Sequence, residues 1–183
     1  MAEMAAADLV SWGRPVARII ASPLQRTQES AAPISTAFKL PVDLDERIIE
    51  PTNAFEGKHM RGPDSALKQP ANWKYLVNPF RPSWGEPYKQ VVARMTAAMT
   101  DAALSVDDGD IVFVSHQLPI WVTHRHVTRA PLMHDPRHRR CALSSITSFE
   151  FADPSDPSAG FVEVAYANPA ERLQVGAIDV GAV

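Results

Sequence analysis

The sequence lacks several features that would narrow its class. It has one cysteine, Cys141, in 183 residues, which excludes an internal disulfide and makes the reducing cytoplasm the expected location. It has no basic and apolar leader and no long uncharged apolar run, so we expect neither a secretory signal nor a membrane span. Its formal net charge of -3 gives no overall attraction to nucleic acid or anionic lipid. Any phosphate recognition must therefore depend on a local group of arginines.

What the chain does contain is enough apolar surface for a core. Apolar residues make up 45% of its 183 positions, which suits one domain of ordinary size. We predict a single domain over residues 1–183, with the weakly patterned residues 170–183 as a candidate loose tail. The sixteen prolines favour long, shaped connections between elements.

Strand and helix patterns alternate along the chain. Apolar runs of strand length occur at 16–21, 111–114, 142–151 and 161–166. Helical patterns occur at 2–12, 24–38, 87–104 and 118–127. We expect Ser22 to cap the second helix, Pro33 to kink or shorten it, and Pro87 to occupy the first position of the third. The alternation predicts an α/β fold, with a sheet covered by helices on both faces.

Residues 39–86 have no long periodic segment and are dense in Pro, Asn, Trp and charge. We expect this stretch to be a structured excursion over the active site. The aromatic residues within 72–84 could line a substrate pocket, but a satellite core beneath a long loop is the favoured interpretation.

Two polar groups follow predicted strands in a way that suits phosphate. Arg26 in Ser22-Pro23-Leu24-Gln25-Arg26 lies in the first turn of a helix after strand 16–21, where a guanidinium can bind two phosphoryl oxygens. His116 in Phe113-Val114-Ser115-His116 ends another apolar strand, and ligand groups collect at carboxyl ends of strands. The alternatives are a surface arginine on an ordinary helix and a buried histidine satisfied by backbone.

A stretch rich in histidine and arginine raises two further alternatives. A metal site is disfavoured because no carboxylate set completes it and the nearby arginines would repel a cation. A nucleic-acid patch is disfavoured by the acidic net charge. A solvated loop, or a second contact to an anionic substrate near the phosphate pocket, explains residues 135–140 more simply. The stretch contains His124, Arg125, His126, Arg129, His134, Arg137, His138, Arg139 and Arg140.

Taken together, the motifs resemble those of the histidine phosphatase (phosphoglycerate mutase-like) superfamily. Segment 17–30 is similar to its Ser-Pro-Leu-x-Arg motif, and Val114-Ser115-His116 to the motif of its second histidine. Gln117 stands where the family usually has glycine, which alters the turn. The resemblance implies a three-layer α/β/α fold, with Ser22, Arg26 and His116 binding phosphate and no metal or cofactor.

The family's proton donor is a glutamate in a segment that residues 48–57 resemble. Glu50 is our candidate for this acid, and it would need a raised pKa to protonate a leaving oxygen near neutral pH. Glu46 and Glu56 remain alternatives, as does an exposed loop carboxylate with no catalytic role.

The family's nucleophile is a histidine in an Arg-His-Gly triplet, and this triplet does not occur in the sequence. Residues 1–10 resemble the middle of the family's first helix, so we expect an N-terminally truncated fold whose first central strand is absent. The resemblance implies a phosphomonoester hydrolase or, second to that, a phosphoglycerate mutase, acting through phosphohistidine in a full-length form and inactive as the given chain. The alternative is a non-catalytic pseudo-phosphatase that binds phosphorylated ligands or protein partners. The expected ligand is a phosphorylated small molecule or an inorganic oxyanion; the oligomeric state stays open.

Overall fold

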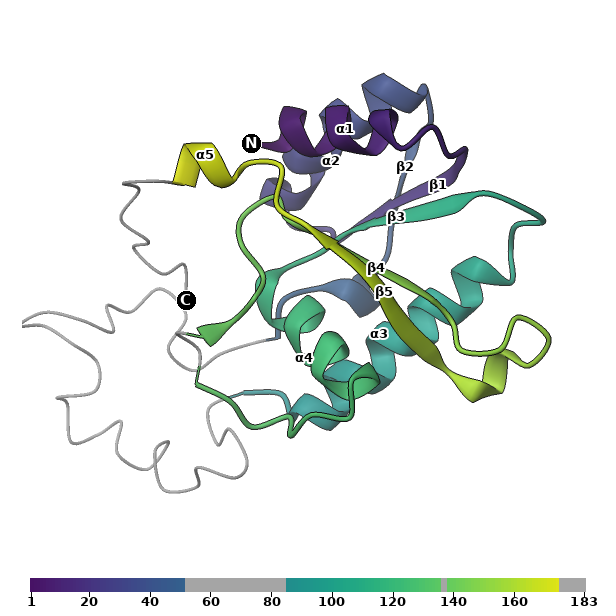
Figure 1. Cartoon of the computed structure of the whole chain (residues 1–183), viewed down its shortest axis with the longest axis vertical. Helices are drawn as coiled ribbons and strands as arrows, with labels where there is room; N and C mark the ends of the chain where they lie inside the picture. Colours follow the sequence, from purple (N-terminus) through teal and green to yellow (C-terminus); the bar gives the residue numbers. More distant parts are fainter. Residues whose placement is uncertain (52–84, 136–137, 175–183) are drawn as a thin grey trace, which may run out of the picture.

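The computed structural model describes residues 1–51, 85–135 and 138–174 (Figure 1). The helices are α1 (Ala2–Ser11), α2 (Gln25–Phe38), α3 (Tyr88–Ala103), α4 (Gln117–Val127) and α5 (Glu171–Gln174). The strands are β1 (Val16–Ala21), β2 (Val42–Leu44), β3 (Asp110–Val114), β4 (Ile146–Phe151) and β5 (Phe161–Ala167). Two 3₁₀ turns are η1 (Glu46–Ile48) and η5 (Pro157–Ala159).

The central sheet is parallel, with the strand order β2-β1-β3. Ala21, the last residue of β1, is in register with Val114, the last residue of β3. The residues that follow these two strands therefore emerge side by side at one edge of the sheet. Strands β4 and β5 form a separate antiparallel pair, and within the described ranges β3 pairs with no strand besides β1.

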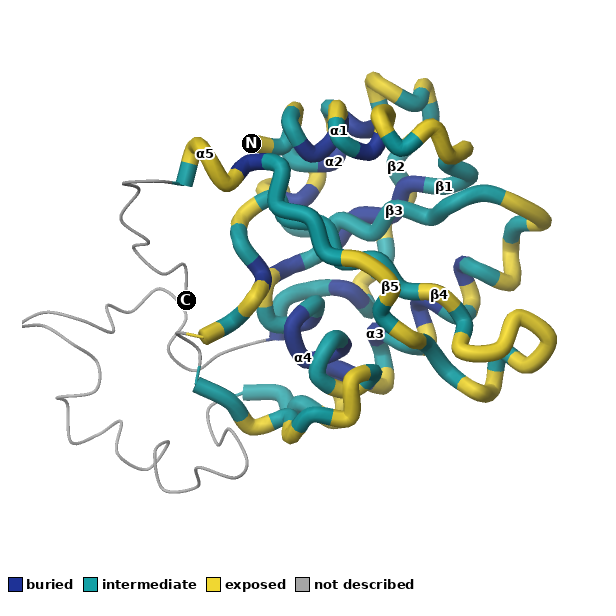
Figure 2. The backbone as a smooth tube through the Cα atoms, in the orientation of Figure 1, coloured by how far each residue is buried: buried dark blue, intermediate teal, exposed yellow. Residues whose placement is uncertain are grey.

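Helices cover both faces of the parallel sheet, with α1 and α2 on one side and α3 and α4 on the other (Figure 1). Adjacent residues of a strand point to opposite faces, so Ile19 packs in the cluster with α1 and α2 while Ile20 packs with α3 and α4. Both side chains are buried, as expected for a parallel sheet. In Figure 2 the buried positions gather on β1 and on the helices around it. The predicted three-layer α/β architecture is confirmed.

Two predictions about the starts of helices were wrong, and Pro33 does not shorten α2; the alternative expectation, a kink at Pro33, stays a prediction. The N-cap of α2 is Leu24 instead of Ser22, because the Ser22 hydroxyl contacts His116. Pro33 lies inside α2, which continues to Phe38. The helix tolerates this proline because its buried face packs on the sheet, which offsets the lost backbone hydrogen bond. Pro87 is the N-cap of α3 and not its first helical residue.

Strand β2 and turn η1 lie within 39–86, where the sequence predicted no element. The rest of that excursion, including the aromatic residues before position 85 and the alternative acid Glu56, lies outside the described residues. At the other end, Ala170 is buried and α5 follows it, while residues 175–183 lie outside the description. In the part of the chain that is described, no helix has the length and apolarity needed to cross a membrane.

Candidate functional site

Four residues predicted to act together come from four different segments. Ser22 directly follows β1, Arg26 lies in the first turn of α2, Glu50 follows η1, and His116 is the N-cap of α4. Because β1 and β3 are paired in parallel, Ser22 is held beside the end of β3, and its N–H donates to the Val114 carbonyl at 3.0 Å. We refer to these four residues as the candidate phosphate site.

His116 is the centre of this site. Its Nε2 lies 2.8 Å from the Ser22 Oγ, and its Nδ1 lies 3.1 Å from Arg26 Nη2 and 3.3 Å from Arg26 Nε. A guanidinium can only donate, so Nδ1 accepts and the ring proton is on Nε2, which donates to Ser22. The residue is 7% exposed. Burial, together with the positive charges of Arg26 and Arg94, lowers the pKa of His116 to about 4, so the ring is neutral at pH 7.

Of the two candidate acids within the described residues, Glu46 and Glu50, Glu50 lies beside His116. Its Oε2 is 3.9 Å from His116 Nδ1, and its side chain is 32% exposed. Glu46 is exposed on η1 and makes no described contact with His116, while Glu56 lies outside the described residues. The geometry therefore supports Glu50 as the carboxyl group of the site.

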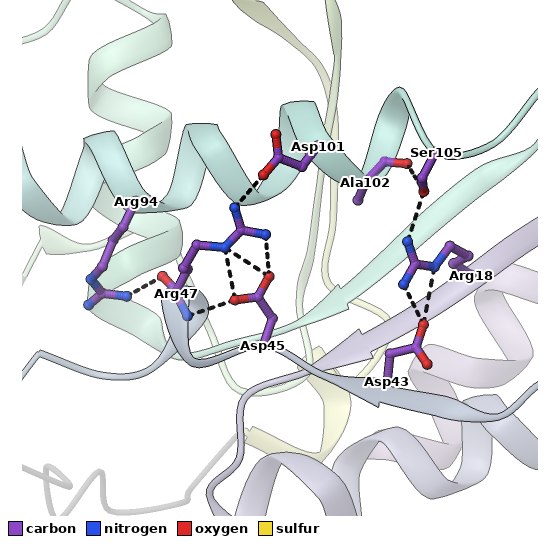
Figure 3. Close-up of polar contacts among 8 residues, drawn as sticks. All are labelled: Arg18, Asp43, Asp45, Arg47, Arg94, Asp101, Ala102 and Ser105. Atoms are coloured by element: carbon purple, nitrogen blue, oxygen red, sulfur yellow. Dashed lines mark hydrogen bonds and ion pairs between the residues drawn. The ribbon is translucent and has the colours of Figure 1, made fainter.

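Arg94 fixes the backbone that carries Glu50, and Figure 3 shows its bond to the Arg47 carbonyl in that segment. From α3, its Nη2 donates to the Ile49 carbonyl at 2.6 Å and its Nη1 donates to the Arg47 carbonyl. Glu86 binds the same guanidinium through both carboxylate oxygens, at 2.9 to 3.1 Å. Because Arg94 is 17% exposed, these bonds are shielded from solvent. The sequence placed the start of this helix at Pro87 but did not reveal the contact between Arg94 and the segment that carries Glu50.

Two further contacts hold the same segment. Arg47 pairs with Asp45 next to it and with Asp101 on α3, as Figure 3 shows, and this guanidinium holds the pKa of Asp45 below its usual range. From the end of β3, the Ser115 hydroxyl donates to the Ile48 carbonyl at 2.7 Å. The position of Glu50 is thus set by α3 and β3 together.

A second polar group lies where α4 begins. Gln117 donates from Nε2 to the Cys141 carbonyl at 2.9 Å and accepts at Oε1 from Arg139 Nη1 at 3.2 Å. Arg139 also donates from Nε to His134 Nε2 at 3.0 Å. Sequence reasoning did not assign Gln117 or Arg139 to the site, although it had considered a contact to an anionic substrate within residues 135–140.

The other histidines have different surroundings. His124 Nδ1 pairs with Glu163 of β5, which also binds Arg140, and the His124 ring stacks on Trp121 at 4.7 Å. This group joins α4 to β5. Among the described residues, no three His, Cys, Asp or Glu side chains come together as metal ligands.

Comparison with known proteins gives three findings. The model of the histidine phosphatase superfamily (branch 1) matches residues 1–157. The uncharacterised protein Rv0525 of Mycobacterium tuberculosis strain H37Rv is 45% identical over 157 residues, which are 86% of this chain and 75% of the relative. Protein MT0547 of strain CDC 1551 is 44% identical over the same shares of the two chains.

Solved structures share the fold at low sequence identity. The mycobacterial glucosyl-3-phosphoglycerate phosphatase Rv2419c superimposes with a TM-score of 0.62 at 19% identity, covering 89% of this chain and 82% of that chain. The phosphoserine phosphatase of Entamoeba histolytica, in complex with 3-phosphoglyceric acid, gives a TM-score of 0.67 at 18% identity, covering 91% of this chain and 80% of that chain. These likenesses confirm the predicted phosphoglycerate mutase-like fold.

Proposed function

The chain belongs to the histidine phosphatase superfamily, and we propose that its candidate phosphate site binds the phosphoryl group of a small phosphomonoester. The observation that supports this proposal is the meeting of Arg26 and His116, which are 90 positions apart in sequence. A planar guanidinium beside an imidazole at the carboxyl ends of two parallel strands is suited to binding an oxyanion. On the basis of the single cysteine, we place this activity in the cytoplasm.

Each group has a distinct role in this proposal. Arg26 donates to two phosphoryl oxygens. In the structure, the same Nε and Nη2 groups of Arg26 contact His116 Nδ1. When a phosphoryl oxygen replaces Nδ1 as the acceptor of the Arg26 bonds, neutral His116 takes its other tautomer: it donates to that oxygen from Nδ1 and accepts the Ser22 hydroxyl proton at Nε2, so neither residue adds a full charge. Glu50, close to His116, protonates the oxygen of the leaving alcohol, for which its pKa must be raised.

The family's reaction needs a nucleophilic histidine as well. In that scheme an imidazole nitrogen bonds to phosphorus as the bond to the leaving oxygen breaks, and water then cleaves the phosphorus–nitrogen bond to release phosphate. Because the sequence has no Arg-His-Gly triplet, we propose that residues 1–183 alone bind phosphate without turnover. Hydrolysis of phosphomonoesters, in preference to mutase activity, belongs to a form that includes such a histidine.

A non-catalytic role is the second candidate. The arrangement of Ser22, Arg26 and His116 holds an oxyanion without needing the nucleophile, which favours a pseudo-phosphatase that binds phosphorylated ligands or protein partners. This role and the enzymatic role require the same pocket, and they differ in whether covalent transfer occurs.

Titration of the purified chain with inorganic phosphate tests the shared part of both proposals. We expect one weak site by calorimetry or NMR, and loss of that site in Arg26→Ala, because charge-assisted hydrogen bonds dominate such binding. Arg14→Ala is the matched control, since Arg14 pairs with Asp110 at the opposite end of β3. Absence of a site, or a site that persists in Arg26→Ala, would contradict the proposal.

A further inference from the structure

A groove between α3 and α4 lies away from the candidate phosphate site. Both helices cover the same face of the parallel sheet (Figure 1). His126, in the last turn of α4, is about 15 Å along the helix from His116 at its start. The groove has a volume of about 380 Å³, which is within the range of small-molecule sites. Its lining residues are Lys89, Val92, Ala93, Thr96, His126 and Leu132.

The floor of this α3–α4 groove is apolar and preformed. Val92 is buried in the core, and Leu132 packs against the same core cluster from the loop after α4. That loop is tied to the helix because Arg125 Nε donates to the Pro131 carbonyl. The Thr96 hydroxyl donates to the Val92 carbonyl at 2.9 Å, within its own helix. The floor therefore offers an apolar surface to a ligand, and the Thr96 hydroxyl proton is already used.

The donors at the rim are the Lys89 ammonium and the His126 imidazole, one from each helix. Both residues are exposed, and among the described residues neither side chain has a hydrogen-bond or ion-pair partner. The helix dipole accounts for His126 in a last turn, but it disfavours Lys89, which lies in the first turn of α3. An anion bound at the rim would be attracted by both the ammonium and the N-terminal end of α3.

The two helices that form the walls bring no carboxylate to the groove. Residues 88–100 of α3, and residues 117–134 of α4 and the loop after it, contain no Asp or Glu. Glu86 and Asp101, near the two ends of α3, are each bound by an arginine. The groove is thus locally positive in a chain whose formal net charge is -3. Charge complementarity favours an anionic ligand with an apolar body.

We propose that the α3–α4 groove binds a small aliphatic carboxylate. Its chain lies on Val92 and Leu132, and its carboxylate accepts from Lys89 and His126. A carboxylate fits better than a phosphate, because ammonium and imidazole are single-point donors whereas the arginine fork is the better match for phosphate. The site does not depend on the proposed function, since its ligand needs no phosphoryl group.

Titration of the 183-residue protein with octanoate tests this proposal. 1-Octanol has the same chain without the charge, and acetate has the same charge without the chain. We expect octanoate to bind about tenfold more tightly than 1-octanol, as one hydrogen bond between charged groups provides, and acetate to show no binding in the same range. Affinities come from chemical-shift changes in ¹H–¹⁵N NMR spectra, which should be largest for the residues that line the groove.

Variants connect this preference to the groove. Lys89→Gln should bring the ratio of the two affinities close to one, because the charged donor is lost. Ala93→Phe, at an exposed position of α3, should fill the groove and abolish binding of both ligands. The matched control is Lys39→Gln, because Lys39 is an exposed lysine at the C-cap of α2, on the other face of the sheet. This control should keep the tenfold ratio.

Arg26→Ala separates this site from the candidate phosphate site, where a carboxylate could bind as well. Octanoate should bind to Arg26→Ala as it does to the wild type. Loss of octanoate binding in Arg26→Ala together with its retention in Lys89→Gln would assign the carboxylate to the phosphate site and overturn the proposal. Equal affinities for octanoate and 1-octanol in the wild type, or no binding of octanoate, would also overturn it. Failure of inorganic phosphate to bind would contradict the proposed function alone.

Discussion

Lowering the pH from 7.5 to 5 should destabilise the protein through His116. The pKa of this histidine is about 4 in the folded protein, against its usual value of 6.5. Below pH 6.5 His116 is protonated in the unfolded chain but stays neutral in the folded protein. The contribution of His116 to the free energy of unfolding is therefore fully present above pH 6.5 and is lost as the pH falls toward 4. Each pH unit in this window costs about 1.4 kcal/mol. By pH 5, about 2 kcal/mol should be lost.

Urea unfolding at several pH values, compared between wild type and His116→Gln, isolates this contribution. Glutamine can still accept from Arg26 and donate to Ser22, but it does not titrate. Burial also lowers the pKa of His134, so the wild-type stability should fall by more than the His116 share. The variant should therefore keep a smaller pH dependence, with about 2 kcal/mol less loss by pH 5.

The matched control is His138→Gln, because the His138 side chain is 81% exposed. This variant should follow the wild-type curve. Curves for wild type and His116→Gln that run parallel from pH 7.5 to 5, within about 0.5 kcal/mol, would refute the assignment of a buried, neutral imidazole at the centre of the site.

Four further outcomes are expected. Residues 1–183 should show no turnover of p-nitrophenyl phosphate above background; acid-labile phosphohistidine that depends on one of the six histidines would contradict this. An extended version with an added strand and Arg-His-Gly loop should gain turnover that requires its new histidine, Arg26 and His116. In that form Glu50→Gln should slow alkyl phosphates much more than p-nitrophenyl phosphate, and equal slowing would count against Glu50 as the acid. Arg94→Met should lower the free energy of unfolding, measured in urea, by about 3 kcal/mol, because it leaves Glu86 and two backbone carbonyls without their donor. The control is Arg18→Met, which breaks a more exposed pair with Asp43 and should lower the free energy of unfolding by less than about 1 kcal/mol.

The contrast between these two arginines can be followed in Figure 3. Arg18 joins β1 to Asp43 of β2 and to Ser105 after α3, in a partly exposed group. Arg94 is more buried and holds the segment that carries Glu50. If both substitutions had the same effect, the special role of Arg94 in fixing that segment would be wrong.

The sequence by itself determined the elements whose signals are local. Strand 16–21 and the helix that starts after Pro87 follow from apolar periodicity, and the structure reproduces them closely. Arg26 and His116 were found because each belongs to a short motif after an apolar strand: Arg26 lies in the first turn of the helix after strand 16–21, and His116 lies just after strand 111–114. Strand β2 was missed, because its identity depends on pairing with β1 and three residues carry little pattern.

Only the tertiary structure decided which polar groups meet. Ser22 has the residue type of a helix cap, but His116, 94 positions away, engages its hydroxyl. Glu50 was one of three candidate carboxylates; Arg94 and Ser115 hold its backbone segment so that its side chain lies near His116, while Glu56 is outside the described residues. In the sequence, Gln117 was only a difference from the family's usual glycine. In the structure, it contacts Arg139 and Cys141, which belong to a later segment that lies against the start of α4. These are long-range contacts whose free energy depends on the packing of the whole domain, so no local window of sequence contains them.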